Sequence, residues 1–127
     1  MPNKNDRPVF LDLTRIHMPV NALVSIAHRV SGLLLFLAIP LVILTLSLSL
    51  RDEDGYAQVQ ALFDGVAMKL LAWLVLWALA HHVLAGLRFL LIDLGVGVDR
   101  DSSRRGAWLV NIASGIALLV LGGMLFS

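Results

Sequence analysis

The chain contains no cysteine, and only 15% of its 127 residues are charged. The absence of cysteine excludes disulfides, thiolate ligation of haem iron and cysteine-held iron–sulfur clusters within this polypeptide. The formal net charge of +1 says little about partners, and we expect none of them to be a nucleic acid. The first twenty residues also lack the apolar stretch of a signal peptide, because charged side chains interrupt them (Lys4, Asp6, Arg7, Asp12 and Arg15).

Apolar sequence dominates instead, since 58% of the residues are hydrophobic. That share is too high for an ordinary soluble domain of this length. Three uncharged runs are long enough, or nearly so, for a membrane span of about 20 residues: Val30–Leu50, Leu70–Leu87 and Gly106–Ser127. The sequence therefore predicts an all-α integral membrane protein. We expect an N-terminal arm over residues 1–20 and a three-helix membrane domain over residues 21–127, with helices at about 22–50, 66–94 and 106–126.

The distribution of basic residues predicts the orientation of these helices. Four precede or enter the first run, two lie between the first and second runs, and four lie between the second and third (Lys4, Arg7, Arg15, Arg29; Arg51, Lys69; Arg88, Arg100, Arg104, Arg105). Because cytoplasmic segments carry the excess of Lys and Arg, we expect the N-terminus and the second loop in the cytoplasm. The first loop and the C-terminus then face the other side.

The segment SIAHRVSG, at residues 25–32, places chemistry at the entry of the first helix. Ser25, His28, Arg29 and Gly32 follow the spacing of one helix face. A hydroxyl, an imidazole and a guanidinium beside a gap suit an anionic or carbonyl-bearing ligand. Arg29 could pair with a carboxylate such as a haem propionate, and Ser25 could donate to a carbonyl oxygen. The alternative is that His28 and Arg29 only anchor the helix end at lipid headgroups.

The adjacent histidines His81 and His82 lie inside the second apolar run, where ionisable groups are costly. His82 shares a helix face with small residues and Phe89, so a flat macrocycle could lie against that face beside an iron-ligating imidazole (Ala78, Ala85 and Gly86). His81 points about 100° away and is a candidate donor, subunit contact or spare polar group. The alternative is that both histidines form hydrogen bonds between helices. Six-coordinate haem would need a second histidine from another polypeptide, since His28 sits at the helix entry.

The third run is typical of a packing helix. It carries small residues that allow close helix approach in lipid (Ala113, Ser114, Gly115, Gly122 and Gly123). Asn111 is its one strongly polar group, for which we expect a hydrogen bond between helices. In the arm, Arg15 and His17 are candidate contacts to a soluble partner without an assigned mechanism.

Three motifs together resemble a known family. RPVFLDL (residues 7–13), SIAHRVSG and HHVLAGLRFLLIDLG (residues 81–95) resemble the large cytochrome b membrane-anchor subunit of succinate dehydrogenase, respiratory complex II. The length, the three helices and the intervals between the motifs also fit, so the resemblance covers nearly the whole chain. It has departures as well, because His81 stands where a relative has tyrosine and Phe89 where a relative has histidine.

The resemblance implies a role that composition alone does not. Such an anchor packs with a second anchor subunit, holds a flavoprotein carrying FAD and an iron–sulfur subunit at the cytoplasmic face, and shares haem b with its partner anchor. It implies that His82 is the axial haem ligand, that Ser25 and Arg29 bind ubiquinone, and that His28 and Arg29 lie on the haem-propionate side. Electrons would pass from succinate to quinone in the bacterial inner membrane.

Three other functions remain open on the sequence. A fumarate reductase anchor would run the reaction toward quinol oxidation, and sequence does not fix the direction. A haem-free anchor would only hold the soluble subunits. A small transporter subunit is the third, although no acidic residue lies within the uncharged spans and the polar groups gather at one membrane side.

Overall fold

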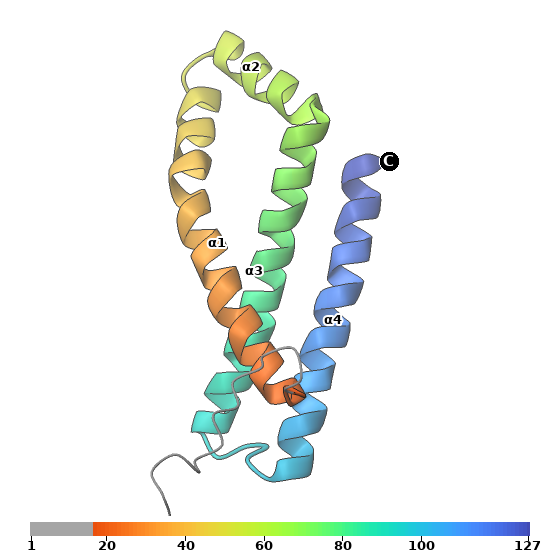
Figure 1. Ribbon diagram of the computed structural model, residues 1–127. Coiled ribbons are helices and arrows are strands. Elements are labelled where there is room, and N and C mark those ends of the chain that lie inside the picture. Colours follow the sequence, from red (N-terminus) through yellow and green to blue (C-terminus); the bar gives the residue numbers. More distant parts are fainter. Residues whose placement is uncertain (1–16) are drawn as a thin grey trace, which may run out of the picture.

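A computed structural model describes residues 17–127 (Figure 1). It contains four helices: α1 (Val20–Ser49), α2 (Glu53–Asp64), α3 (Val66–Asp93) and α4 (Arg100–Phe126). No strand occurs within the described residues, and α1, α3 and α4 are each long and apolar enough to cross a membrane. The prediction of an all-α protein with three membrane helices is therefore confirmed. Arg7–Leu13 and Arg15 of the predicted arm lie outside the described residues.

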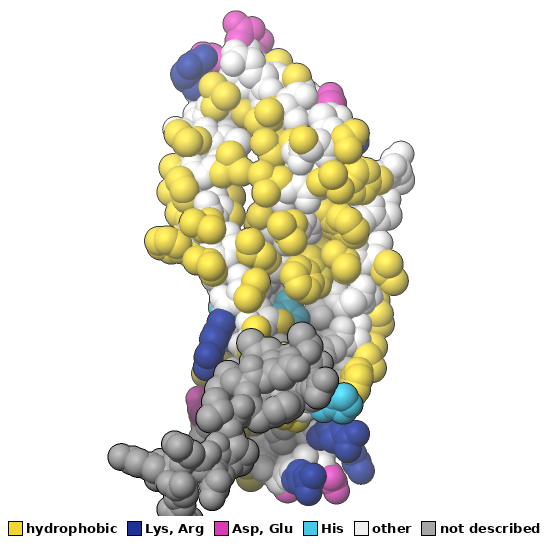
Figure 2. Space-filling model, viewed as in Figure 1, with side chains coloured by type: hydrophobic (Ala, Val, Ile, Leu, Met, Phe, Trp, Pro, Cys, Tyr) yellow, Lys and Arg dark blue, Asp and Glu magenta, His cyan; other side chains and the backbone are white. Residues whose placement is uncertain are grey.

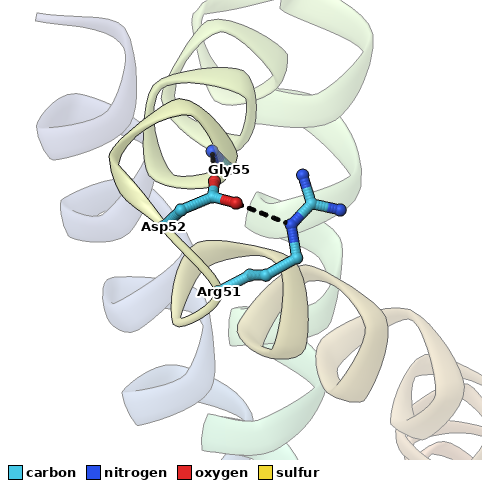
Figure 3. A network of polar contacts seen from close by, with 3 residues as sticks. All are labelled: Arg51, Asp52 and Gly55. Atoms are coloured by element: carbon cyan, nitrogen blue, oxygen red, sulfur yellow. Dashed lines mark hydrogen bonds and ion pairs between the residues drawn. The ribbon is translucent and has the colours of Figure 1, made fainter.

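Helix α2 is an element that the sequence analysis missed, since residues 51–65 were expected to form a loop. Asp52 caps it by accepting a hydrogen bond from the Gly55 N–H at 2.6 Å. The same carboxylate also accepts a hydrogen bond from the Arg51 Nε–H at 2.9 Å (Figure 3). Glu53 and Asp54 in its first turn complement the positive end of the helix dipole. At Gly55 a Cβ would collide with the Leu48 carbonyl oxygen of α1, so only glycine fits this close turn.

A six-residue turn from Leu94 to Asp99 connects α3 to α4, and caps close it at both ends. Gly95 has φ +80°, and the N–H groups of Gly95 and Val96 bond to the carbonyls of Ile92 and Leu91. This Schellman arrangement ends α3 where only glycine adopts the left-handed backbone without strain. Asp99 accepts the Ser102 N–H at 2.9 Å, which lowers the pKa of its carboxyl and starts α4. Helix α4 thus begins at Arg100, six residues before the predicted start at residue 106.

The helices pack most closely at one end of the bundle. We call this the lower end: the start of α1, the end of α3 and the start of α4, which lie together at the bottom of Figure 1. Its core is a cluster of small and branched side chains (Val24, Ala85, Ala107 and Val110). Toward the other end α1 and α3 separate, and α2 bridges them. Small residues let the backbones approach at the lower end, which fixes the positions of the polar side chains there.

Large apolar side chains remain exposed along all three long helices, as Phe36, Leu90 and Leu119 illustrate. Figure 2 shows these side chains covering the middle of the visible face, with charged side chains gathered toward its two ends. A surface of this kind matches a hydrocarbon layer bounded by polar headgroups.

The interhelical hydrogen bonds include those that the alternative interpretation of His81 and His82 predicted, but not the one predicted for Asn111. Trp73 Nε1 donates to the Leu118 carbonyl at 2.7 Å, and His81 pairs with Ser114. Within residues 17–127 no hydrogen bond uses the Asn111 side chain, so the predicted role of Asn111 is wrong for this part of the chain. Its carbonyl instead accepts the Ser114 hydroxyl at 3.1 Å.

Candidate functional site

Two histidines from different helices meet at the lower end. The imidazoles of His28 on α1 and His82 on α3 stack with ring centroids 4.1 Å apart and planes 9° from parallel. Both side chains are half-buried. Phe89 adds an edge-to-face contact to His28 at 5.2 Å. The pair joins residues 54 positions apart and forms the centre of the candidate site.

The hydrogen bonds of His82 fix which ring nitrogen carries the proton. Its Nδ1 lies 3.1 Å from the His28 carbonyl oxygen and 3.2 Å from the Ser31 hydroxyl oxygen. A carbonyl only accepts, and the Ser31 hydroxyl donates its own proton to that same carbonyl at 2.8 Å. Nδ1 therefore bears the proton, and the lone pair of Nε2 is left for a ligand. This is the arrangement that metal-binding histidines use.

Gly32 provides the space in which the His82 ring lies. A Cβ at this position would approach His82 Cε1 to 3.0 Å and Nδ1 to 3.4 Å. The gap predicted on the SIAHRVSG face is thus filled by an imidazole of the neighbouring helix.

We expect Gly32→Ala to displace this imidazole and weaken its bond to the His28 carbonyl, because the added methyl group has no other room. Losing such a supporting contact costs about 10–100-fold in metal affinity, so the haem content of the purified complex should fall under the expectation that His82 ligates haem. Haem is quantified by absorbance per mole of complex. Gly115→Ala on α4 is the control, since a Cβ there meets nothing within 4 Å. Normal haem content in Gly32→Ala would contradict this role for Gly32.

The small residues expected to form one surface around His82 have two separate roles. Ala78 and Ala85 are fully buried, and Ala85 belongs to the core of this chain, so they do not offer an open surface for a macrocycle. Gly86 instead lies beside His28, whose Nε2 would be 3.6 Å from a Cβ at that position. The prediction was wrong on this point because helix periodicity does not tell which small residues pack within the chain.

Ser25 and Arg29 lie at the start of α1, one turn apart. Ser25 is half-buried and Arg29 is exposed, whereas His28 turns toward α3. Within residues 17–127 neither side chain has a hydrogen-bond or ion-pair partner. The four residues of the predicted face therefore form two groups. His28 and Gly32 contact His82, whereas Ser25 and Arg29 form an open edge.

His81 faces the opposite side of α3 and is only 2% exposed. Its Nδ1 lies 3.2 Å from Ser114 Oγ of α4, and its ring packs beside Trp77 at 5.7 Å between centroids. The Ser114 hydroxyl donates to the Asn111 carbonyl, so it accepts from His81. His81 is therefore an interhelical contact inside this chain rather than an exposed contact to another subunit.

Ser31 is the residue of this site that the sequence analysis missed. It is fully buried and connects the His28 carbonyl to His82. A serine in an apolar run is a weak signal, because such hydroxyls often bond only to their own helix backbone. Its place opposite His82 follows only from how α1 docks on α3.

Comparison with known proteins gives one consistent result. Residues 3–121 match the family model described as the succinate dehydrogenase/fumarate reductase transmembrane subunit. The chain is 38% identical over 117 residues to the succinate dehydrogenase cytochrome b556 subunit of Coxiella burnetii, covering 91% of this chain and 94% of that protein. It is 30% identical over 128 residues to the subunit of the same name in Paracoccus denitrificans, covering 98% and 95%.

These matches extend over nearly the whole length of both chains, and both relatives are bacterial. The three apolar helices and the length of the matched segment agree with a multi-pass membrane protein. The chain therefore belongs to the succinate dehydrogenase/fumarate reductase transmembrane subunit family, as a cytochrome b membrane anchor.

Proposed function

We propose that this anchor binds haem b together with a partner subunit and forms part of a ubiquinone-reduction site that receives electrons from succinate. The observation that carries the proposal is the set of contacts of His82: its Nδ1–H bonds to the His28 carbonyl, and its Nε2 has no partner among residues 17–127. The relatives' name, cytochrome b556 subunit, supports haem b as the ligand.

The donor set of the described residues fits one side of a haem. Residues 17–127 contain no group of three or more His, Cys, Asp or Glu that would hold a bare metal ion. A single imidazole suffices when a macrocycle supplies the equatorial ligands. The bound haem supplies reversible one-electron transfer, with a potential set by its axial ligands and burial.

His28 does not complete the coordination in this arrangement. The lone pair of an imidazole nitrogen lies in the ring plane, and the two stacked planes differ by only 9°. Their lone pairs therefore lie in two nearly parallel planes, and the stacked rings would not hold one iron between them. A histidine from a partner anchor would then be needed as the second ligand, and His28 would contact the edge of the haem on the propionate side.

Ser25 and Arg29 are the proposed quinone contacts of this chain. The Ser25 hydroxyl would donate to a carbonyl oxygen of ubiquinone, and the Arg29 guanidinium would stabilise negative charge that develops as the quinone is reduced. Their open edge supports this role, because both side chains are free of partners within residues 17–127. Arg29 also lies one residue from His28, where it can reach a haem propionate.

The partners follow from the same proposal. A second membrane-anchor subunit would cover the histidine site, and an iron–sulfur subunit and an FAD-containing flavoprotein would dock at the lower end. With the basic residues concentrated at that end, the N-terminus would lie in the cytoplasm and the bilayer would be the bacterial inner membrane.

The test is purification of the whole complex from membranes through a C-terminal tag on this chain. We expect the flavoprotein, the iron–sulfur subunit and a second anchor to co-purify, a b-type reduced-minus-oxidised spectrum, and succinate-dependent reduction of a ubiquinone analogue. An intact complex without haem absorbance would identify a haem-free anchor. Quinol-dependent fumarate reduction without the forward reaction would identify a fumarate reductase.

A further inference from the structure

A second polar centre at the lower end, distinct from the histidine pair, is built around Arg88 of α3. This arginine is only 9% exposed. Its Nη2 donates to the Asn21 side-chain oxygen at 3.0 Å, the Ser103 carbonyl at 2.9 Å and the Ser103 hydroxyl at 3.0 Å. Arg88 therefore ties the end of α3 to the starts of α1 and α4.

The guanidinium keeps unused hydrogen-bonding capacity. All three bonds leave from one nitrogen, whereas its Nε is buried without a partner and faces α4, where a Cβ at Gly106 would be 3.3 Å away. Within residues 17–127 the one ion pair is Arg51–Asp52 at the opposite end of the bundle, so no carboxylate from this part of the chain balances Arg88. A buried charge without a counter-ion is costly, and neutral acceptors offset only part of that cost.

A groove of about 280 Å³ adjoins this charge between α3, the turn after it and α4. Its polar corner combines Arg88 with Ser102 and Ser103. Its walls are apolar side chains of both helices (Leu84, Leu87, Leu91, Ile92, Leu109 and Val110). Leu87 and Leu109 are 55% and 67% exposed, so the groove opens onto the lipid-facing surface.

We propose that this groove binds one anionic phospholipid, with its phosphate at the Arg88 corner and an acyl chain along Leu87, Leu91 and Leu109. Three features select this occupant. The guanidinium needs an anion and matches the geometry of phosphate. The adjoining wall is long and apolar. The corner lies where α4 changes from charged to apolar sequence, which is the headgroup level of a bilayer. The inference goes beyond the haem and quinone assignments and does not depend on them.

The test uses the intact complex, delipidated in mild detergent and then titrated with dioleoylphosphatidylglycerol, with bound lipid counted by native mass spectrometry. We expect each wild-type complex to bind one phosphatidylglycerol in this titration. Arg88→Gln should weaken its binding by about tenfold or more, the scale of one lost charge-assisted contact. Arg105→Gln is the matched control, because Arg105 is an exposed arginine near the start of α4, at the same end of the bundle, and its loss should leave binding unchanged.

A second variant covers the case in which Arg88→Gln prevents assembly. Leu109→Trp fills the groove from its exposed wall and leaves every Arg88 hydrogen bond intact, so it should expel the lipid from an assembled complex. Equal binding of dioleoylphosphatidylcholine by the wild type would overturn the proposal, as would undiminished phosphatidylglycerol in Leu109→Trp. A wild-type complex that binds no lipid, with Arg88 paired to a carboxylate from a partner or from residues 1–16, would overturn it too. Competition by inorganic phosphate would support the phosphate corner.

Discussion

Replacing His82 by alanine is expected to abolish the b-type absorbance of the purified complex. The variant removes the imidazole whose Nε2 is free for iron and whose Nδ1–H is fixed by the His28 carbonyl. Neither neighbouring histidine is placed to replace it, because His81 is buried toward α4 and the His28 ring is stacked nearly parallel to that of His82. The measurement is a reduced-minus-oxidised spectrum normalised to the flavin content of the same preparation.

Two further variants separate ligand loss from general damage. His17→Ala removes an exposed histidine at the same end of the bundle and should leave the spectrum unchanged. His81→Ala breaks the bond to Ser114. The free energy of unfolding should therefore fall by about 1–3 kcal/mol while haem remains bound. Haem loss in His81→Ala together with a normal spectrum in His82→Ala would reverse the assignment of the axial ligand.

Ser25→Ala and Arg29→Ala are expected to lower succinate-dependent quinone reduction by about 100-fold each, the usual effect of deleting a donor to a developing negative charge. Succinate oxidation by an artificial acceptor should persist, because that reaction takes electrons before they reach the membrane site. The two activities are measured on the same preparation, so their ratio isolates the quinone step.

The matched controls lie at the other end of the chain's first helix. Ser47→Ala and Arg51→Ala change the same residue types at exposed positions far from the histidine pair and should leave the ratio of the two activities unaltered. Wild-type quinone turnover in both Ser25→Ala and Arg29→Ala would remove these residues from the quinone site.

Local sequence patterns predicted the long helices but not their ends. Three apolar runs were enough to predict α1, α3 and α4, since a bilayer leaves few alternatives to a helix. The charged turn at the start of α4 and the polar helix α2 were missed because apolar length says nothing about caps. Asp52 and Asp99 are the side chains that start those helices, and the sequence analysis assigned neither of them as a cap.

The sequence pattern drew attention to the two histidines of the candidate site but not to their contacts. The motif spacing brought attention to His28 and His82, yet their stacking depends on the angle at which α1 crosses α3. Ser31 escaped notice for the same reason, and Arg88 was counted only among the basic residues between the second and third runs. A serine in an apolar helix and an arginine near a helix end look ordinary until a neighbouring helix supplies their partners.

The carbonyl that orients His82, the proposed haem ligand, belongs to a different helix, so the order of assembly matters. While α1 and α3 are apart, the His82 ring is free to carry its proton on either nitrogen and to rotate. Docking the two helices selects one tautomer and one orientation of the His82 ring before any cofactor arrives. The entropy of ordering the ring is therefore lost during folding rather than during cofactor binding. A half-folded chain would thus compete poorly for the proposed haem, and cofactor insertion would report on correct helix pairing.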